Sequence, residues 1–212
     1  MKNKFLSFLC ALLLGISSPA KAEDPAPDVL IKNTVHEVME IVNSDSGIIS
    51  NQKRLLELVD AKILPHFDFT RMTQLSVGRA WRTATAEQRQ ALTVEFQSML
   101  VRTYAKVFST YSDPKVEVKP VKLENGATEA TVRTVIRIKD GTTAAVDYEM
   151  QNSPTGWKVF DVTVEGVSLV TSYRGSFADQ IKQTGIDGLI KTLADKNIEV
   201  RRAAALKQER SN

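Results

Sequence analysis

The sequence predicts an α+β fold in which a curved antiparallel sheet of about four strands packs against a helical layer. Three observations support this fold class. Apolar residues recur at helical spacing over 24–111, apolar and polar residues alternate over 115–165, and helical spacing returns after 168. Turn signals separate the alternating segments, and consecutive hairpins produce an antiparallel sheet.

The first 22 residues have the pattern of a secretory signal peptide. Lys2 and Lys4 precede an apolar run at 5–16, and Ala20-Lys21-Ala22 is a small-x-small cleavage site. We therefore expect a signal peptide at 1–22, a single domain at 23–196 and a charged tail at 197–212. Later apolar runs are shorter than the ~20 residues of a membrane-spanning helix.

The next segments predict two amphipathic helices. The helix at 24–42 starts with two prolines, which are tolerated at a helix start because its first N–H groups lack intrahelical acceptors. Its apolar residues then recur at helical spacing. A second amphipathic helix is predicted at 50–64, where Pro65 closes it.

Two further helices follow before the strands. Asp68 is the expected N-cap of a helix at 68–79, which Gly78 ends. Thr85, with a glutamine three residues later, has capping-box spacing and opens a long helix at 85–111. The apolar set of this long helix is Leu92, Phe96, Met99, Leu100, Tyr104, Val107, Phe108 and Tyr111.

Four strands are predicted, at 115–123, 128–139, 142–151 and 157–165. Asp140-Gly141 is a strong hairpin signal between the second and third strands. Alternation along these strands makes one face of the sheet apolar and the other polar. We expect the long helix to lie over the apolar face, so that helix and sheet form a cone around an apolar pocket.

Charge and cysteine content exclude several classes of function. The formal net charge of +3 equals the charge of Lys2, Lys4 and Lys21, so the mature chain is neutral and has no electrostatic footprint for nucleic acid. The single cysteine, Cys10, lies in the signal peptide. Disulfides, cysteine nucleophiles and cysteine metal sites are therefore excluded from the mature protein.

The sequence offers no catalytic constellation. Its two histidines, His36 and His66, lack metal-ligand spacing, and neither a G-x-S-x-G elbow nor a glycine-rich nucleotide motif is present. Carboxylates such as Asp68 and Asp161 are better explained as caps or hydrogen-bond anchors. We therefore expect no catalytic residue, no metal and no cofactor.

Several short motifs, in this order, resemble the MlaC family. They are Pro65-His66-Phe67-Asp68-Phe69, Gly78-Arg79-Ala80-Trp81, Tyr104, Trp157-Lys158-Val159-Phe160-Asp161-Val162, Glu165-Gly166-Val167-Ser168-Leu169-Val170, Tyr173-Arg174-Gly175-Ser176-Phe177 and Gly185-Ile186-Asp187-Gly188-Leu189-Ile190. The resemblance runs over about 25–196 and follows a signal peptide. The resemblance rests on the combination of these motifs, because no single motif is specific to the family.

The resemblance implies a soluble periplasmic phospholipid carrier and not an enzyme. Such a carrier shields the acyl chains of a glycerophospholipid and shuttles it between an outer-membrane lipoprotein complex and an inner-membrane ABC transporter complex with its substrate-binding subunit. No nucleic acid is expected as a partner. The basic residues of the tail allow transient contact with an anionic membrane surface, although a charged tail is more often simply solvated.

The family resemblance also implies where the lipid binds, between the sheet and the long helix. The residues at matching positions are Tyr104, Val107, Phe108, Val146, Tyr148, Val167 and Leu169. Phe69, Met72 and Leu75 are expected to close the pocket. For each of these residues, ordinary core packing is the alternative explanation.

Two other classes of function stay open at this point. A small periplasmic enzyme would place a carboxylate with a shifted pKa in the same pocket. A chaperone-like interaction module would bind proteins through the apolar face and carry no lipid after purification.

Overall fold

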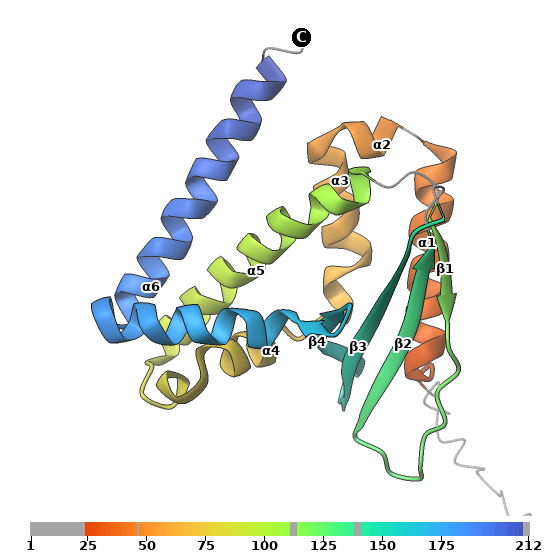
Figure 1. The fold of residues 1–212 in the computed structure, drawn as a ribbon, viewed down its shortest axis with the longest axis horizontal. Helices are drawn as coiled ribbons and strands as arrows, with labels where there is room; N and C mark the ends of the chain where they lie inside the picture. Colours follow the sequence, from red (N-terminus) through yellow and green to blue (C-terminus); the bar gives the residue numbers. More distant parts are fainter. Residues whose placement is uncertain (1–23, 46, 111–113, 138–140, 210–212) are drawn as a thin grey trace, which may run out of the picture.

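The computed structural model describes residues 24–45, 47–110, 114–137 and 141–209, so the predicted signal peptide lies outside the described residues. The helices are α1 (Pro27–Ser44), α2 (Gly47–Ser50), α3 (Gln52–Lys62), α4 (Phe69–Val77), α5 (Ala86–Thr110) and α6 (Leu169–Glu209), with 3-10 turns η1 (Leu64–His66) and η2 (Gly78–Arg82). The strands are β1 (Lys115–Val118), β2 (Glu129–Arg137), β3 (Thr143–Ser153), β4 (Gly156–Val164) and β5 (Val167–Ser168). Figure 1 shows the sheet on one side of the molecule and α5 and α6 on the other.

Local signals in the sequence set most helix ends. The Asp68 carboxylate accepts a hydrogen bond from the Arg71 N–H, which confirms it as the N-cap of α4, and Gly78 ends that helix with a positive φ of 65°. Thr85 and Gln88 bond reciprocally at 3.0 and 3.2 Å, which confirms the capping box of α5. Pro65 differs from expectation: α3 ends at Lys62, and the proline lies in η1.

The sheet has five strands in the order β1-β2-β3-β4-β5, and each neighbouring pair is antiparallel. This confirms the α+β class with an antiparallel sheet. The fifth strand was not predicted. It forms because Glu165 and Gly166 adopt positive φ values of 49° and 79°, as a two-residue hairpin turn requires.

One face of the sheet is apolar, as expected, but α1 covers it instead of the long helix. Seven buried residues form the sheet cluster: Ile31, Val132, Val146, Met150, Trp157, Val159 and Val162. Leu30 and Val35 of α1 pack against this cluster, and Figure 1 shows α1 running along β1 and β2. The expected position of α5 over this face was wrong, because α5 packs mainly against α4 and α6.

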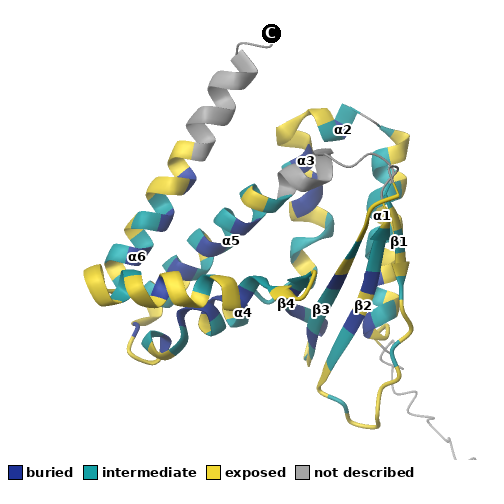
Figure 2. Cartoon of the chain, viewed as in Figure 1, coloured by how far each residue is buried: buried dark blue, intermediate teal, exposed yellow. Residues whose placement is uncertain are grey.

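The described part of α5 instead takes part in a second apolar core, the helical cluster. Its buried members are Met72, Val77, Trp81, Leu92, Phe96, Leu100, Phe160, Val170, Phe177, Leu189 and Leu193. Figure 2 shows buried residues where α4, α5 and α6 meet. Phe67, just before α4, packs against both clusters and forms a parallel bridge with Val159 of β4.

The last helix bends sharply at one glycine. Gly185 has φ 73° and ψ −179°, a conformation that essentially only glycine adopts. Figure 1 shows α6 running along α4 before the bend and turning away after it. The helix continues to Glu209, across the expected boundary between domain and tail at 196. Among the described residues, no helix combines the length and apolar character that crossing a membrane demands.

Candidate functional site

Seven of the ten predicted lipid-binding residues fall on two apolar surfaces. Phe69, Met72, Leu75 and Tyr104 belong to or pack against the helical cluster. Val146, Tyr148 and Leu169 belong to or pack against the sheet cluster. Val167 is 59% exposed in the short strand β5, and the side chains of Val107 and Phe108 lie outside the described residues. The structure thus divides the predicted site between two surfaces.

The two surfaces adjoin at the start of α6. Leu169 packs against the sheet cluster, whereas Val170 and Tyr173 belong to the helical cluster or pack against it. Asp161 fixes this junction, because its carboxylate accepts hydrogen bonds from the Ser168 hydroxyl at 2.5 Å and from the Val170 N–H at 3.1 Å. Asp161 is therefore a structural anchor for the beginning of α6.

Burial changes along the apolar face of the sheet. Val132 and Met150 are fully buried, whereas Ile136, Ala144 and Val164 are only half-buried. Residues of β2 and β3 that face one another share a side of the sheet, and Ile136 is paired with Ala144. The half-buried residues lie at the end of the sheet where β2 ends and β3 begins, the same end of the molecule as the C-terminus of α5 (Figure 1).

Burial also decreases along helix α1. Ile31 is 6% exposed in the sheet cluster, and Val38 and Val42 stand seven and eleven residues later, so they point in nearly the same direction from the helix axis. Both are half-buried. One end of the apolar layer is therefore closed, and the other leaves apolar side chains incompletely covered.

Tyr148 places a hydroxyl group within this apolar layer. Burial raises the pKa of Tyr148, and a hydrogen bond with Thr134 opposes that shift. The Thr134 hydroxyl in turn donates to the Val146 carbonyl at 2.8 Å. This chain of hydrogen bonds lets a polar atom lie on the apolar face without losing its partners.

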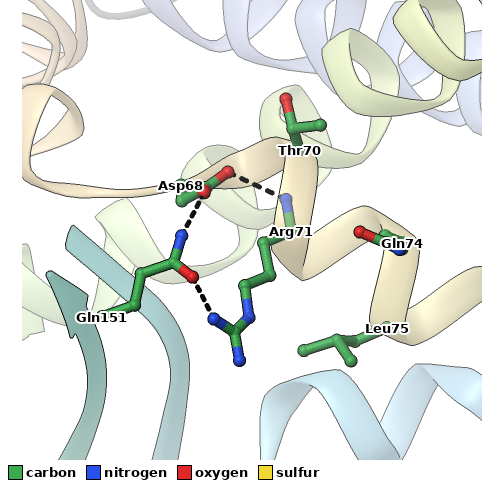
Figure 3. Close-up of a pocket in the computed structure, with 6 residues that line it drawn as sticks. All are labelled: Asp68, Thr70, Arg71, Gln74, Leu75 and Gln151. Atoms are coloured by element: carbon green, nitrogen blue, oxygen red, sulfur yellow. Dashed lines mark hydrogen bonds between the residues drawn. The ribbon is translucent and has the colours of Figure 1, made fainter. Parts of the chain in front are cut away.

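A polar cavity of about 760 Å³ lies between α4 and β3. Its lining residues are Asp68, Thr70, Arg71, Gln74, Leu75 and Gln151. Figure 3 shows Asp68 and Arg71 of the α4 start bridged by Gln151 of β3. The Gln151 amide donates to Asp68 at 2.6 Å, and the Arg71 guanidinium donates to the Gln151 side-chain oxygen.

Arg71 is the centre of this polar network. Its guanidinium pairs with Glu129 of β2 at 2.6 Å and lies 3.8 Å above the centre of the Phe160 ring. The cavity therefore has paired charges of both signs, and its side chains tie α4 to the sheet. Sequence analysis did not identify this role of Arg71, because a local sequence pattern contains no information on partners 58 and 80 residues away.

The described residues contain no group of three or more histidine, cysteine or acidic side chains placed to hold a metal ion. His66 is half-buried in η1, and burial, with a smaller contribution from the Lys158 charge, lowers its pKa. Asp68 and Asp161, the carboxylates weighed as acids or bases, are engaged as a helix cap and an anchor.

The fold of the chain matches that of a solved structure. The phospholipid-binding protein from Ralstonia solanacearum, solved in complex with a phospholipid, has a TM-score of 0.77 and 34% sequence identity. The match covers 84% of this chain and 99% of that one.

Two curated proteins are also similar in sequence. The intermembrane phospholipid transport system binding protein MlaC of Haemophilus influenzae is 23% identical over 194 residues, 90% of this chain and 91% of its own. The toluene tolerance protein ttg2D of Pseudomonas putida is 31% identical over 112 residues, about half of each chain. The family model of the MlaC protein matches residues 32–195, which include α4, the whole sheet and the first part of α6. This match extends over most of the chain, and the chain belongs to the MlaC family.

Proposed function

We propose that this protein is a soluble periplasmic carrier that binds a glycerophospholipid and shields its acyl chains between the sheet cluster and the helical cluster. The observation that carries the proposal is the likeness to a protein solved with a phospholipid bound, at 34% identity over nearly the whole of that chain. The half-buried apolar residues at one end of the layer between α1 and the sheet support it.

Shielding is required by the size of the hydrophobic effect. A phospholipid has on the order of 30 acyl methylene groups, and exposing each to water costs about 0.8 kcal/mol, or roughly 24 kcal/mol in all. A contact with the headgroup alone is too weak to offset that cost. A carrier must therefore cover the chains with apolar side chains.

The proposed walls of the cavity are the ten residues predicted from the sequence. Phe69, Met72, Leu75 and Tyr104 form the proposed helical wall, and Val107 and Phe108 of α5 stay part of the predicted set. Val146, Tyr148 and Leu169 form the sheet wall, and exposed Val167 lies at the rim. We assign no catalytic role to the paired charges around Arg71.

The proposed route of transport is the one implied by the family. The protein accepts lipid from one membrane-bound complex and delivers it to another, an outer-membrane lipoprotein complex at one end and an inner-membrane ABC transporter with its substrate-binding subunit at the other. Secretion by the signal peptide at 1–22 places it in the periplasm between them. The direction of lipid transport is then set by the free-energy difference between lipid bound to one partner and lipid bound to the other.

The test is native mass spectrometry of the mature protein purified from periplasm without detergent, followed by lipid identification. We expect an added mass equal to one or two phospholipids. Leu169→Glu is expected to lose this adduct, because an unpaired carboxylate in a dry apolar site is costly. Val94→Glu is the matched control, since Val94 is 55% exposed on α5 and is expected to retain lipid.

A wild-type protein that carries no lipid and takes none up from vesicles would contradict the proposal. So would a folded Leu169→Glu variant with full lipid content, which would contradict the assignment of the sheet wall. A protein adduct in place of lipid would instead favour the chaperone-like alternative.

A further inference from the structure

The cavity between α4 and β3 contains hydrogen-bonding groups that the fold does not use. Two N–H groups of the Arg71 guanidinium are engaged, one by Gln151 and one by Glu129. A guanidinium has further N–H donors, and those of Arg71 have no acceptor among the described residues. The exposed side chains of Thr70 and Gln74, one turn of α4 apart, line the same cavity, and the described part of the chain offers them no hydrogen-bond partner. Several donors are therefore available to an acceptor group in the cavity.

The positive charge of Arg71 is held in one place at this cavity. The Glu129 carboxylate accepts its hydrogen bond at 2.6 Å, and the centre of the Phe160 ring lies 3.8 Å from the guanidinium carbon. The Arg71 side chain is only 29% exposed, so its charge is partly shielded from water. A guanidinium fixed in this way has little entropy to lose when it binds a phosphate oxygen.

Negative charge lies beside this guanidinium. Glu129 stands opposite Gln151 in the register of β2 and β3, and Gln151 lines the cavity. One Glu129 carboxylate oxygen accepts from Arg71, and the other has no partner among the described residues. The Asp68 carboxylate also lines the cavity, where it accepts from the Arg71 backbone N–H and the Gln151 amide. Because two carboxylates surround one guanidinium, a group that carries both charges fits this cavity better than a simple anion does.

The cavity borders the helical cluster. Leu75 lines the cavity and packs against that cluster, and Figure 3 shows its side chain pointing toward the Arg71 guanidinium. Phe160, which the guanidinium covers, is a buried member of the same cluster. A lipid whose acyl chains lie against the helical cluster can therefore place its headgroup in the cavity.

We propose that this cavity is a headgroup site for a phosphodiester that is followed by a primary ammonium group, the headgroup of phosphatidylethanolamine. This inference rests on the proposed function. The free N–H groups of Arg71 donate to the phosphate oxygens, and the free Glu129 oxygen accepts from the ammonium group. Thr70 and Gln74 add uncharged hydrogen bonds. The headgroup of phosphatidylglycerol keeps the phosphate contact but brings no cation to Glu129.

The experiment gives the protein a choice between two headgroups. Mature protein freed of lipid is incubated with vesicles of equal parts phosphatidylethanolamine and phosphatidylglycerol with identical acyl chains, and native mass spectrometry measures the occupancy by each lipid. Glu129→Gln removes the negative charge but keeps a side-chain oxygen that can accept from Arg71. Glu117→Gln is the matched control, because Glu117 is an exposed glutamate that pairs with Lys119 of the sheet edge instead. Thermal unfolding verifies that each variant is folded.

Wild type and Glu117→Gln are expected to hold about three- to tenfold more phosphatidylethanolamine than phosphatidylglycerol, the usual worth of one hydrogen bond to a partly exposed charge. Glu129→Gln is expected to lose this preference. Arg71→Met is expected to bind both lipids about three- to tenfold more weakly and to keep the preference, because both lipids contain the phosphodiester.

Wild type that holds the two lipids in equal amounts would overturn the headgroup site. So would a folded Glu129→Gln variant with the wild-type preference, or a folded Arg71→Met variant with wild-type occupancy. Each of these results leaves the carrier function intact, because the protein still holds lipid. Failure of the wild type to take up either lipid would instead overturn the proposed function on which the site rests.

Discussion

At the scale of single residues, Asp68 links three parts of the molecule. One carboxylate oxygen caps α4 through the Arg71 N–H at 2.8 Å, and the other accepts from the Gln151 amide of β3. The Asp68 backbone N–H donates to the Val159 carbonyl of β4 at 2.8 Å. The same residue therefore starts a helix and attaches it to the sheet.

Asp68→Ala is expected to destabilise the protein by about 2 kcal/mol. The change removes the N-cap and leaves the Gln151 amide without its acceptor, and each loss costs on the order of 1 kcal/mol. Urea unfolding followed by circular dichroism measures the effect. Asp60→Ala, at an exposed position of α3, is the control and is expected to change stability by less than about 0.5 kcal/mol.

His66 makes stability depend on pH in the mildly acidic range. Its pKa in the folded protein is lowered, chiefly by burial, so the unfolded chain binds the proton more readily. The stabilising contribution is complete above the unfolded pKa of about 6.5 and is lost as pH falls below it. We expect the urea midpoint to fall between pH 7 and pH 5, and to fall less in His66→Gln.

An NMR titration of the His66 ring provides the direct measurement. A ring pKa at or above 6.5 would contradict the burial argument, whatever the urea midpoints show. His36→Gln serves as the control for the loss of a histidine, since His36 is exposed on α1.

At the scale of secondary structure, the sequence correctly predicted the features that depend on neighbouring residues alone. The cap at Asp68, the capping box at Thr85 and the alternation along β2 and β3 all appear in the structure at their predicted places. These features depend on residues only a few positions apart, so a single sequence contains them.

Features that depend on distant partners were not predictable. Apolar residues of α1 and α5 show the same helical spacing, and nothing in that spacing reveals which helix covers the sheet. Arg71 meets Gln151 and Glu129 only after the fold has formed. For the same reason, the sequence predicted which residues belong to the candidate site, but it did not predict that these residues divide between two apolar clusters.

Gly185 provides a prediction for one element. Gly185→Ala is expected to cost about 1–3 kcal/mol, because the bend in α6 uses a backbone conformation that side chains exclude. Gly175→Ala, in the same helix, is expected to stabilise by up to about 1 kcal/mol, since nothing lies within 4 Å of the new methyl group. Differential scanning calorimetry of both variants checks the signs, and a neutral Gly185→Ala would contradict the assigned strain.

At the scale of the whole molecule, two apolar cores share one chain. Each contains one of the two tryptophans: Trp81 is buried in the helical cluster and Trp157 in the sheet cluster. Phe67 packs against both, and its ring stacks on Phe69 with centres 5.5 Å apart. The aromatic side chain therefore couples the two cores.

Phe67→Ala is expected to lower stability by about 2–3 kcal/mol, less than a fully buried phenylalanine because Phe67 is half-buried. We also expect the two cores to unfold separately in this variant. Urea unfolding followed by fluorescence in Trp81→Phe and Trp157→Phe backgrounds reports each core alone. The wild-type transitions should coincide, and the Phe67→Ala transitions should not.

Coincident transitions in Phe67→Ala would show that other contacts, such as the Arg71 network, suffice to couple the cores. Adding Arg71→Met to the Phe67→Ala variant then separates the contributions of Phe67 and Arg71 to the coupling of the two cores. The guanidinium pairs with Glu129 across the junction, and methionine keeps only the apolar part of that side chain.

The first strand, β1, is poorly suited to pairing with another chain. β1 is the outer strand of the sheet, only four residues long, with Lys115 and Glu117 on its exposed positions and prolines at 114 and 120 on either side. Prolines and charges prevent a second chain from extending the ladder. Copies of the molecule at high concentration therefore resist joining into continuous sheets through this edge.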